Sequence, residues 1–245
     1  IVQNANTSTT QGNIDYTADA GSINMTEAKS TTTGQGNVTY TAGADINSQI
    51  VKSNAGNIAL TANRDVVIGN ETTTALGQVA ITAKTGGITT EADAPISAQG
   101  QDPINGNISL TAATGIRQNA NVISQGYGDI SYKSATGDIV QNANTSTTQG
   151  NIDYTADAGS INMTELRSTS TGQGKVTYTA GTDINSQIVK SNAGNIALTA
   201  NRDVVIGNET TTALGQVAIT AKTGGITTEA DAPISAQGQG AVNGN

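Results

Sequence analysis

Residues 11–23, with the sequence QGNIDYTADAGSI, contain the pattern from which the fold of the whole chain can be argued. Polar and apolar residues alternate over 13–18, which is the period of a β-strand with one buried face. Residues 19–22 have the composition of a turn, and a second short strand is expected at 23–25. A third segment of small and polar residues then leads to Gly36. The stretch therefore predicts a coil of two or three short strands joined by turns.

The same pattern recurs along the chain, each time opening on a glycine that is followed by a polar residue and then by Ile or Val. The first seven opening glycines, 20 to 29 residues apart, are Gly12, Gly36, Gly56, Gly77, Gly106, Gly128 and Gly150. One such coil cannot bury a face alone. Stacking pairs each strand with its equivalent in the next coil, in parallel and ~4.8 Å away, and builds a continuous core.

A larger repeat contains the smaller one, because residues 1–107 recur at 139–245 with 99 identities. The eight differences are Ala28/Leu166, Lys29/Arg167, Thr32/Ser170, Asn37/Lys175, Ala44/Thr182, Asp102/Gly240, Pro103/Ala241 and Ile104/Val242. We therefore expect a first six-coil unit at 1–138 and a second, truncated unit at 139–245, within one continuous solenoid. The fidelity of the copy suggests recent tandem duplication and an array that continues beyond this stretch.

These repeats predict an all-β fold, a right-handed parallel β-helix (β-solenoid) with about 20–24 residues per coil and almost eleven coils. The right hand is expected because parallel crossover connections nearly always have it. No sustained 3.6-residue period indicates helices. Leucine-rich repeats, calcium-binding nonapeptide rolls and β-propellers fit less well, since the chain has only six Leu and lacks both the GGxGxD motif and aromatic blade signatures.

Composition excludes several kinds of chemistry. The chain has no Cys, His, Trp or Phe, and its formal net charge is −8. It therefore cannot build the usual zinc or copper sites, a disulfide, or a Ser-His-Asp or Cys-His nucleophile, and we expect no cofactor. Lys and Arg are scattered singly, which argues against a nucleic-acid partner. No apolar run exceeds three residues, whereas a membrane-spanning helix needs about 20, so no membrane insertion is expected.

The motif GN[IV]xLTA, followed by a turn and an Asp-Ile or Asp-Val pair, resembles the haemagglutinin-type repeats of large secreted bacterial adhesins of the filamentous-haemagglutinin type. The matching stretches are 56–62 with 65–66, 36–42 with 45–46, 106–112, and the Ile-Ser-Gln-Gly element at 123–126. The resemblance covers nearly the whole chain. It implies a secreted, elongated shaft displayed on a cell surface. The secretion domain and receptor-binding regions of that family have no counterpart among these motifs.

One column of the repeat is aromatic in some coils and aliphatic in others. Its aromatic members are Tyr16, Tyr40, Tyr132, Tyr154 and Tyr178, and its aliphatic members include Leu60, Ile81 and Leu110. The alternation places this column inward, so we expect an internal aromatic ladder. The alternative is an exposed strip of rings that stacks against sugars.

Two further columns are polar. The residue after each opening glycine includes Asn13, Asn37 and Asn57, and stacked amides there are expected to hydrogen-bond along the axis. An outward column of Thr17, Thr41, Thr61, Thr82 and Thr111 is similar to the flat face of ice-binding proteins. The neighbouring outward column is mixed rather than Thr, which argues against that function.

Acidic residues suggest two possible sites. Asp45 and Asp65 precede the second strand on neighbouring coils, where stacked carboxylates could hold Ca²⁺, although Arg64 beside Asp65 favours a solvated turn. The longest gap between opening glycines contains prolines, which cannot donate to an interior ladder, so we expect a protruding loop near 91–105. Its candidate contact residues are Glu91, Asp93, Pro95, Asp102 and Pro103. A tolerated insertion without function is the competing interpretation.

The sequence thus favours a non-catalytic structural shaft of an extracellular adhesin or surface filament, secreted and displayed on the cell surface. Expected partners are further copies of the repeat array, end to end or side by side, and a host or neighbouring cell surface. Alternatives are a module that binds glycans or a cell receptor through the loop near 91–105, a polysaccharide-active β-helix enzyme, and an ice-binding protein. Paired convergent carboxylates flanked by aromatic residues, which glycoside hydrolysis uses, are not evident.

Overall fold

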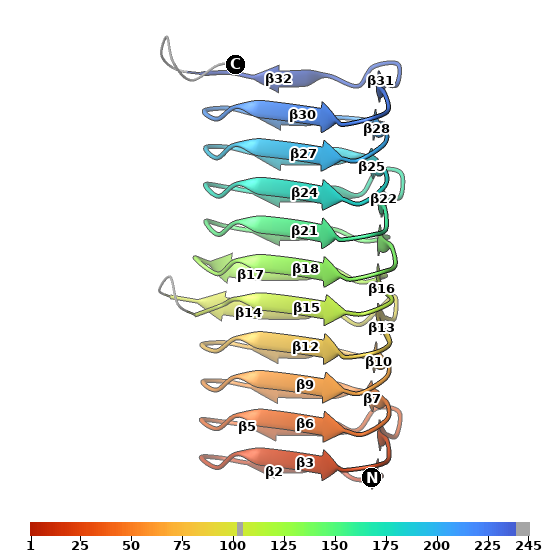
Figure 1. The fold of residues 1–245 in the computed structure, drawn as a ribbon. Coiled ribbons are helices and arrows are strands. Elements are labelled where there is room, and N and C mark those ends of the chain that lie inside the picture. The colour runs from red at the N-terminus through yellow and green to blue at the C-terminus, as the bar shows by residue number, and fades with distance from the viewer. Residues whose placement is uncertain (102–104, 239–245) are drawn as a thin grey trace.

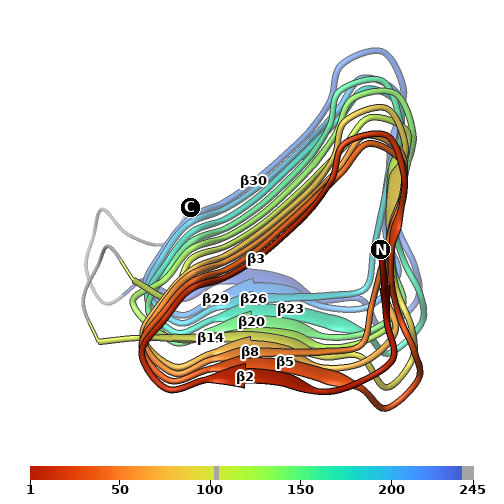
Figure 2. The ribbon, with the colours of Figure 1, turned by 90° about the horizontal axis from the view of Figure 1, so that it is seen from below.

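The protein is a three-sided β-solenoid. The computed structural model describes residues 1–101 and 105–238, and every regular element within them is a β-strand. Each coil adds one strand to each of three parallel sheets, so the cross-section is triangular (Figure 2). In Figure 1 the chain crosses the front from left to right, returns behind and rises toward the C-terminus, which is a right-handed path. The predicted all-β parallel solenoid of about eleven coils is confirmed.

The strands of each sheet follow one another at intervals of three in the chain. Sheet A contains β1 (Val2–Gln3), β4 (Ile23–Met25), β7 (Ile46–Ser48), β10 (Val66–Ile68), β13 (Gly87–Thr90), β16 (Gly115–Gln118), β19 (Ile139–Gln141), β22 (Ile161–Met163), β25 (Ile184–Ser186), β28 (Val204–Ile206) and β31 (Ile226–Thr228). Sheet B contains β2 (Thr7–Thr9), β5 (Ser30–Thr33), β8 (Ile50–Ser53), β11 (Thr72–Thr74), β14 (Ile96–Gly100), β17 (Val122–Gly126), β20 (Thr145–Thr147), β23 (Ser168–Thr171), β26 (Ile188–Ser191), β29 (Thr210–Thr212) and β32 (Ile234–Ala236). Sheet C contains β3 (Ile14–Ala18), β6 (Val38–Ala42), β9 (Ile58–Ala62), β12 (Val79–Ala83), β15 (Ile108–Ala112), β18 (Ile130–Ser134), β21 (Ile152–Ala156), β24 (Val176–Ala180), β27 (Ile196–Ala200) and β30 (Val217–Ala221).

The core is narrow and is filled by aliphatic side chains. In β9, Ile58, Leu60 and Ala62 are fully buried while the two residues between them face outward. The same alternation recurs on all three sheets, because successive side chains of a strand point to opposite faces. Stacked Ile, Val, Leu and Ala form one buried cluster that runs along the interior.

The two repeat units join without a break in any sheet. β18 of the first unit pairs with β21 of the second over five positions, from Ile130 opposite Ile152 to Ser134 opposite Ala156. β16 pairs with β19, and β17 with β20, across the same boundary. The backbone hydrogen bonds therefore link residues 1–138 to the following residues as they link any two neighbouring coils.

The opening glycines lie at the corner between sheets B and C, where neighbouring coils approach closely. A Cβ atom at Gly150 would lie 2.0 Å from the carbonyl oxygen of Gly128 in the coil beneath. No side chain fits at that distance, and the sequence pattern opens on glycine for this reason.

The predicted single loop at 91–105 is wrong over 96–100. These residues form β14, which pairs with β11 and β17, and Ile96 and Ala98 are fully buried. The prolines stand outside the strand, so its amides remain free to donate. Glu91, Asp93 and Pro95 belong to a turn at the corner between sheets A and B, and residues 102–104 lie outside the described residues.

Candidate functional site

The tyrosine column lies inside the solenoid. Tyr40, Tyr132, Tyr154 and Tyr178 are at most 1% exposed, and Tyr16 in the first coil is half-buried. Ring centroids are 5.1 Å apart for Tyr16–Tyr40, 4.2 Å for the nearly parallel Tyr132–Tyr154 pair and 4.7 Å for Tyr154–Tyr178. The rings stack along the axis as an internal ladder and present no face to a sugar.

The phenol oxygens are satisfied by polar side chains that also lie in the core. The Tyr178 hydroxyl donates to Thr169 Oγ1 at 2.5 Å and to Gln141 Oε1 at 3.4 Å. Thr169 Oγ1 in turn donates to Gln141 Oε1 at 3.0 Å. Tyr154, Thr145 and Gln118 repeat the arrangement one coil earlier. Buried polar groups need such partners, and the network fixes the rotamer of each ring.

Sequence reasoning missed this network, although a signal for it was present. A Thr precedes the Tyr by nine residues in four coils: Thr7–Tyr16, Thr31–Tyr40, Thr145–Tyr154 and Thr169–Tyr178. Burial away from water raises the pKa of the Tyr40, Tyr132, Tyr154 and Tyr178 hydroxyls above the ordinary value of about 10, because the charged tyrosinate is poorly solvated there.

The asparagine column is exposed, and its bonds differ from the expected amide-to-amide ladder. The backbone N–H of Asn37 donates to Asn13 Oδ1 at 2.9 Å, and that of Asn57 donates to Asn37 Oδ1 at 2.8 Å. Each side chain thus accepts from the backbone of the next coil. Bonds between two Asn side chains occur instead on sheet A, where Asn185 Nδ2 donates to Asn162 Oδ1 at 2.6 Å.

A buried hydroxyl column supports the corner between sheets B and C. Thr171 Oγ1 donates to the Gly150 carbonyl at 2.8 Å and accepts from the Gly174 N–H at 3.0 Å. Ser53 and Ser191 make the same pair of bonds in their coils. The signal in the sequence is Ser or Thr three residues before an opening glycine, which sequence reasoning did not use.

Asp45 and Asp65 do not face a shared cation position. Asp45 forms an ion pair with Arg64, and its Oδ1 also accepts from the Asp65 N–H at 3.2 Å. Asp65 Oδ1 accepts from the Gly87 N–H at 2.8 Å. The Arg64 guanidinium holds the pKa of Asp45 below its ordinary value. Within residues 1–101 and 105–238, no three acidic side chains gather as potential metal ligands.

Three of the candidate contact residues lie in the described part of the chain, at the corner between sheets A and B. Glu91 and Asp93 are exposed at the corner between sheets A and B, and Pro95 is half-buried there. Asp102 and Pro103 lie outside the described residues.

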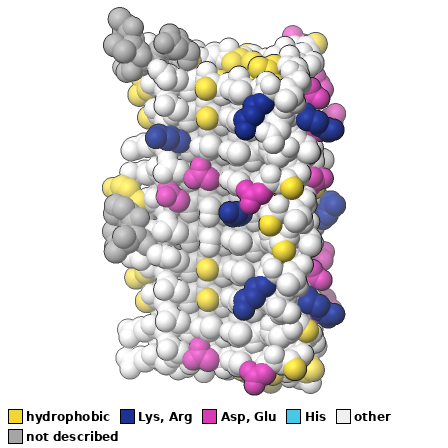
Figure 3. All heavy atoms as spheres, in the orientation of Figure 1, with side chains coloured by type: hydrophobic (Ala, Val, Ile, Leu, Met, Phe, Trp, Pro, Cys, Tyr) yellow, Lys and Arg dark blue, Asp and Glu magenta, His cyan; other side chains and the backbone are white. Residues whose placement is uncertain are grey.

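The outer face of sheet C carries the threonine column. Thr17, Thr41, Thr61, Thr82 and Thr111 are in register on successive strands, and Lys133 interrupts the column on β18. Lys133 pairs with Asp157 at 3.6 Å. Charged side chains are scattered over this face without forming a patch of one sign (Figure 3). No helix in the described part of the chain has the length and apolarity to span a bilayer.

Comparison with known proteins gives no relative. No family model matches the chain, and neither a curated protein nor a solved structure matches it.

Proposed function

We propose that the protein is a non-catalytic structural shaft of an extracellular adhesin or surface filament. The observation that carries this proposal is the continuity of all three sheets across the boundary between two nearly identical units. A chain built this way can be extended unit by unit without changing its cross-section. Length and stiffness are then the properties that the sequence encodes.

The mechanics follow from the hydrogen bonds. Every interior coil bonds to the coil on each side through three parallel ladders, so tension along the axis is shared among them. Six coils at ~4.8 Å make ~29 Å of shaft per 138-residue unit. The tyrosine, threonine and glutamine network adds side-chain bonds between coils inside the same shaft.

Location and partners form part of the same proposal. The resemblance of the repeats to secreted adhesins of the filamentous-haemagglutinin type supports a secreted protein on a cell surface. Further copies of the array, end to end or side by side, and a host or neighbouring cell surface are its proposed partners. The scattered cations and the net charge of −8 support a role without nucleic acid.

The absence of a catalytic role is also proposed rather than observed. The carboxylates of Asp45, Asp65, Asp183 and Asp203 accept hydrogen bonds from the next coil, a ladder role that recurs in both units. A reacting group would be expected at one place in the chain and to be directed toward a cleft.

Electron microscopy of the native material tests the proposal. Uniform thin rods with an axial repeat of ~29 Å, or a simple multiple of it, are expected. Compact particles without axial periodicity would rule out the shaft.

A further inference from the structure

A shallow groove crosses the outer face of sheet B in the first unit. Its volume is about 200 Å³, and it is lined by Lys52, Glu71, Thr73, Ser97 and Gln99, among others. The floor is low because Thr73 and Ser97 are small residues at the outward positions of β11 and β14. Lys52 and Glu71 form one wall.

The groove recurs in the second unit. There it is lined by Lys190, Glu209, Thr211, Ser235 and Gln237, the same residue types 138 positions later, and has a volume of about 290 Å³. A shaft of many units would therefore display the groove once per unit, at ~29 Å intervals along one side. Sites that are weak individually gain strength when a long ligand engages several of them.

The charges in the groove cancel. Lys52 Nζ lies 2.6 Å from Glu71 Oε2, and Lys190 Nζ lies 2.7 Å from Glu209 Oε2. The other lining groups named above are hydroxyls and an amide, which both donate and accept hydrogen bonds. This inventory suits an uncharged ligand rich in hydroxyl groups and gives no net attraction to a sulfated or phosphorylated one.

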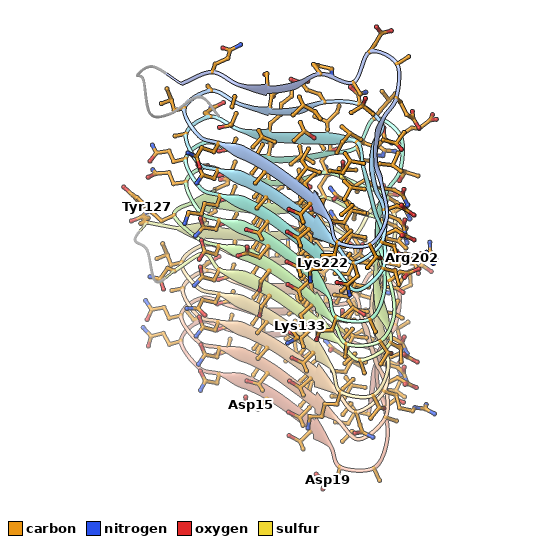
Figure 4. The ribbon with its side chains drawn as sticks, turned by 45° about the horizontal axis from the view of Figure 1, so that its top comes forward. Asp15, Asp19, Tyr127, Lys133, Arg202 and Lys222 are labelled. Atoms are coloured by element: carbon orange, nitrogen blue, oxygen red, sulfur yellow. The ribbon has the colours of Figure 1, made fainter. Side chains whose placement is uncertain are left out.

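Beside the groove, an exposed aromatic ring follows the end of β17. Gln99 in the groove pairs in register with Gln125 of β17, and Tyr127 follows two residues later, just past the end of that strand. Tyr127 is 43% exposed, whereas the other tyrosines point into the core. Figure 4 shows it projecting from the edge of the shaft. An exposed ring next to amides offers a flat apolar face with polar groups at its border.

We propose that this groove and Tyr127 bind an uncharged linear polysaccharide, which lies along the shaft axis. Equivalent outward positions on successive strands lie ~4.8 Å apart along the axis, so an extended sugar chain lying along the shaft passes over one strand after another. Tyr127 stacks on one sugar, and Ser97, Gln99 and Gln125 bond hydroxyls of its neighbours. The inference rests on the proposed function, since the shaft must be displayed where such polymers occur.

The test is binding of this chain to cellohexaose, mannohexaose and chitohexaose, with heparin as the charged comparator. Tyr127→Ala is expected to weaken binding about ten-fold, while Tyr127→Phe, which keeps the ring, leaves it unchanged. Gln99→Ala is expected to weaken binding as well. Leu166→Ala is the matched control, because Leu166 is 74% exposed at a different corner.

Two results would overturn the groove proposal. One is no binding of any uncharged oligosaccharide, and the other is equal binding by Tyr127→Ala and the unaltered chain. Stronger binding of heparin than of the uncharged oligosaccharides would also count against it. If only the saccharide-binding proposal is wrong, microscopy would still show rods with a ~29 Å axial repeat. If the shaft proposal is wrong, such rods would be absent.

Discussion

At the scale of single residues, one inward column of sheet B shows that the contribution of a buried Thr hydroxyl to stability depends on the side chains around it. Thr169 of this column bonds Tyr178 and Gln141. Thr72 occupies the same column between Val51 and Ile96, and its hydroxyl has no hydrogen-bond partner among the described residues. The residue type is the same, but the coil of Thr72 has no Tyr or Gln to complete the network. A hydroxyl without a partner in the core costs free energy.

This contrast predicts opposite effects of one substitution. Thr169→Val should lower the free energy of unfolding by about 1–3 kcal/mol, because Tyr178 and Gln141 lose a buried partner. Thr72→Val should leave it unchanged or raise it by about 1 kcal/mol, since an unsatisfied hydroxyl is replaced by a methyl group of similar size. Urea midpoints of the two variants check the prediction. Equal losses in both would show that the network contributes nothing.

The buried tyrosines also predict a pH dependence. Burial raises the pKa of Tyr40, Tyr132, Tyr154 and Tyr178, whereas unfolded tyrosine ionises near pH 10. Below about pH 10 both states are protonated and no stability is lost. Above it the unfolded state releases protons that the folded state retains, so stability should fall by up to about 1.4 kcal/mol per pH unit for each ring.

Urea unfolding at pH 9, 10.5 and 11.5 measures this loss, with Tyr154→Phe as the variant that removes one titrating group. The free energy of unfolding should fall less steeply with pH in Tyr154→Phe, and the difference should equal the contribution of one tyrosine. Ionisation of the buried rings with an unchanged native circular dichroism spectrum would contradict the prediction.

At the scale of elements, strands and corners obey different constraints. The strands need only alternation, and Tyr, Leu and Ile replace one another in the column that contains Tyr40, Leu60 and Ile81. Certain corner glycines admit little variation, because backbone atoms of the neighbouring coil come close to them. Gly159, for example, would place a Cβ 2.3 Å from the carbonyl oxygen of Gly137. Among the described residues, four of the five differences between the units lie in corners and one, Thr32/Ser170, lies on a strand, but none falls on such a glycine.

The glycine constraint depends on having a coil beneath, which gives a matched pair of variants. Gly21 and Gly159 have the same neighbours in the chain, but a Cβ at Gly21 would meet nothing within 4 Å. Gly159→Ala should destabilise the protein by about 3 kcal/mol through overpacking, and Gly21→Ala should be near neutral. Thermal unfolding of both variants tests this prediction. Similar melting temperatures would contradict the idea that glycine is required only where a coil lies beneath.

The asparagine column contains a natural substitution with a predictable effect. Lys175 stands where the first unit has Asn37, and its ammonium cannot accept the bond that Asn37 accepts from the Asn57 N–H. Lys175→Asn should therefore stabilise the shaft by about 0.5 kcal/mol and slow hydrogen exchange at the Asn195 amide.

Asn37→Lys is the reciprocal variant and should speed exchange at the Asn57 amide. Amide hydrogen exchange followed by NMR measures both sites. Unchanged exchange in both variants would mean that these exposed bonds do not order the corner.

At the scale of the whole molecule, the solenoid is a one-dimensional stack in which each coil meets only its neighbours. Its stability is then close to a sum of coil and interface contributions, and the end coils, which have one neighbour, are the weakest part. The burial pattern agrees: β12 buries its inward residues, while the equivalent residues of β30 near the end remain partly exposed.

Length should therefore raise stability in a regular way. The chain can be lengthened by 138 residues after residue 238, with the added sequence continuing the repeat from the position equivalent to residue 101. The longer chain should have a higher urea midpoint and be ~29 Å longer. Small-angle scattering and urea titration of the two lengths check both expectations. A longer chain with an unchanged maximum dimension would contradict the continuous stack.

The fold was largely predictable from the sequence, because the pattern that specifies a coil is contained in each repeat of about twenty residues. Alternation in 13–18 and the recurrence of glycine identified the strands and the coil. The loop prediction is wrong over 96–100, because prolines at 95 and 103 suggest one continuous insertion. The strand between them keeps all the amides that its ladder needs.

The sequence by itself determined the coil length, the inward and outward columns and the absence of cysteine and histidine chemistry. Each follows from local periodicity or from composition, which need no knowledge of distant contacts. Only the tertiary structure decided that Gln141, Thr169 and Tyr178 meet in one network, that the Asn side chains accept from backbone amides, and that small residues on β11 and β14 leave a groove. These contacts join residues one or more coils apart, and their partners are set by the register in which neighbouring coils stack.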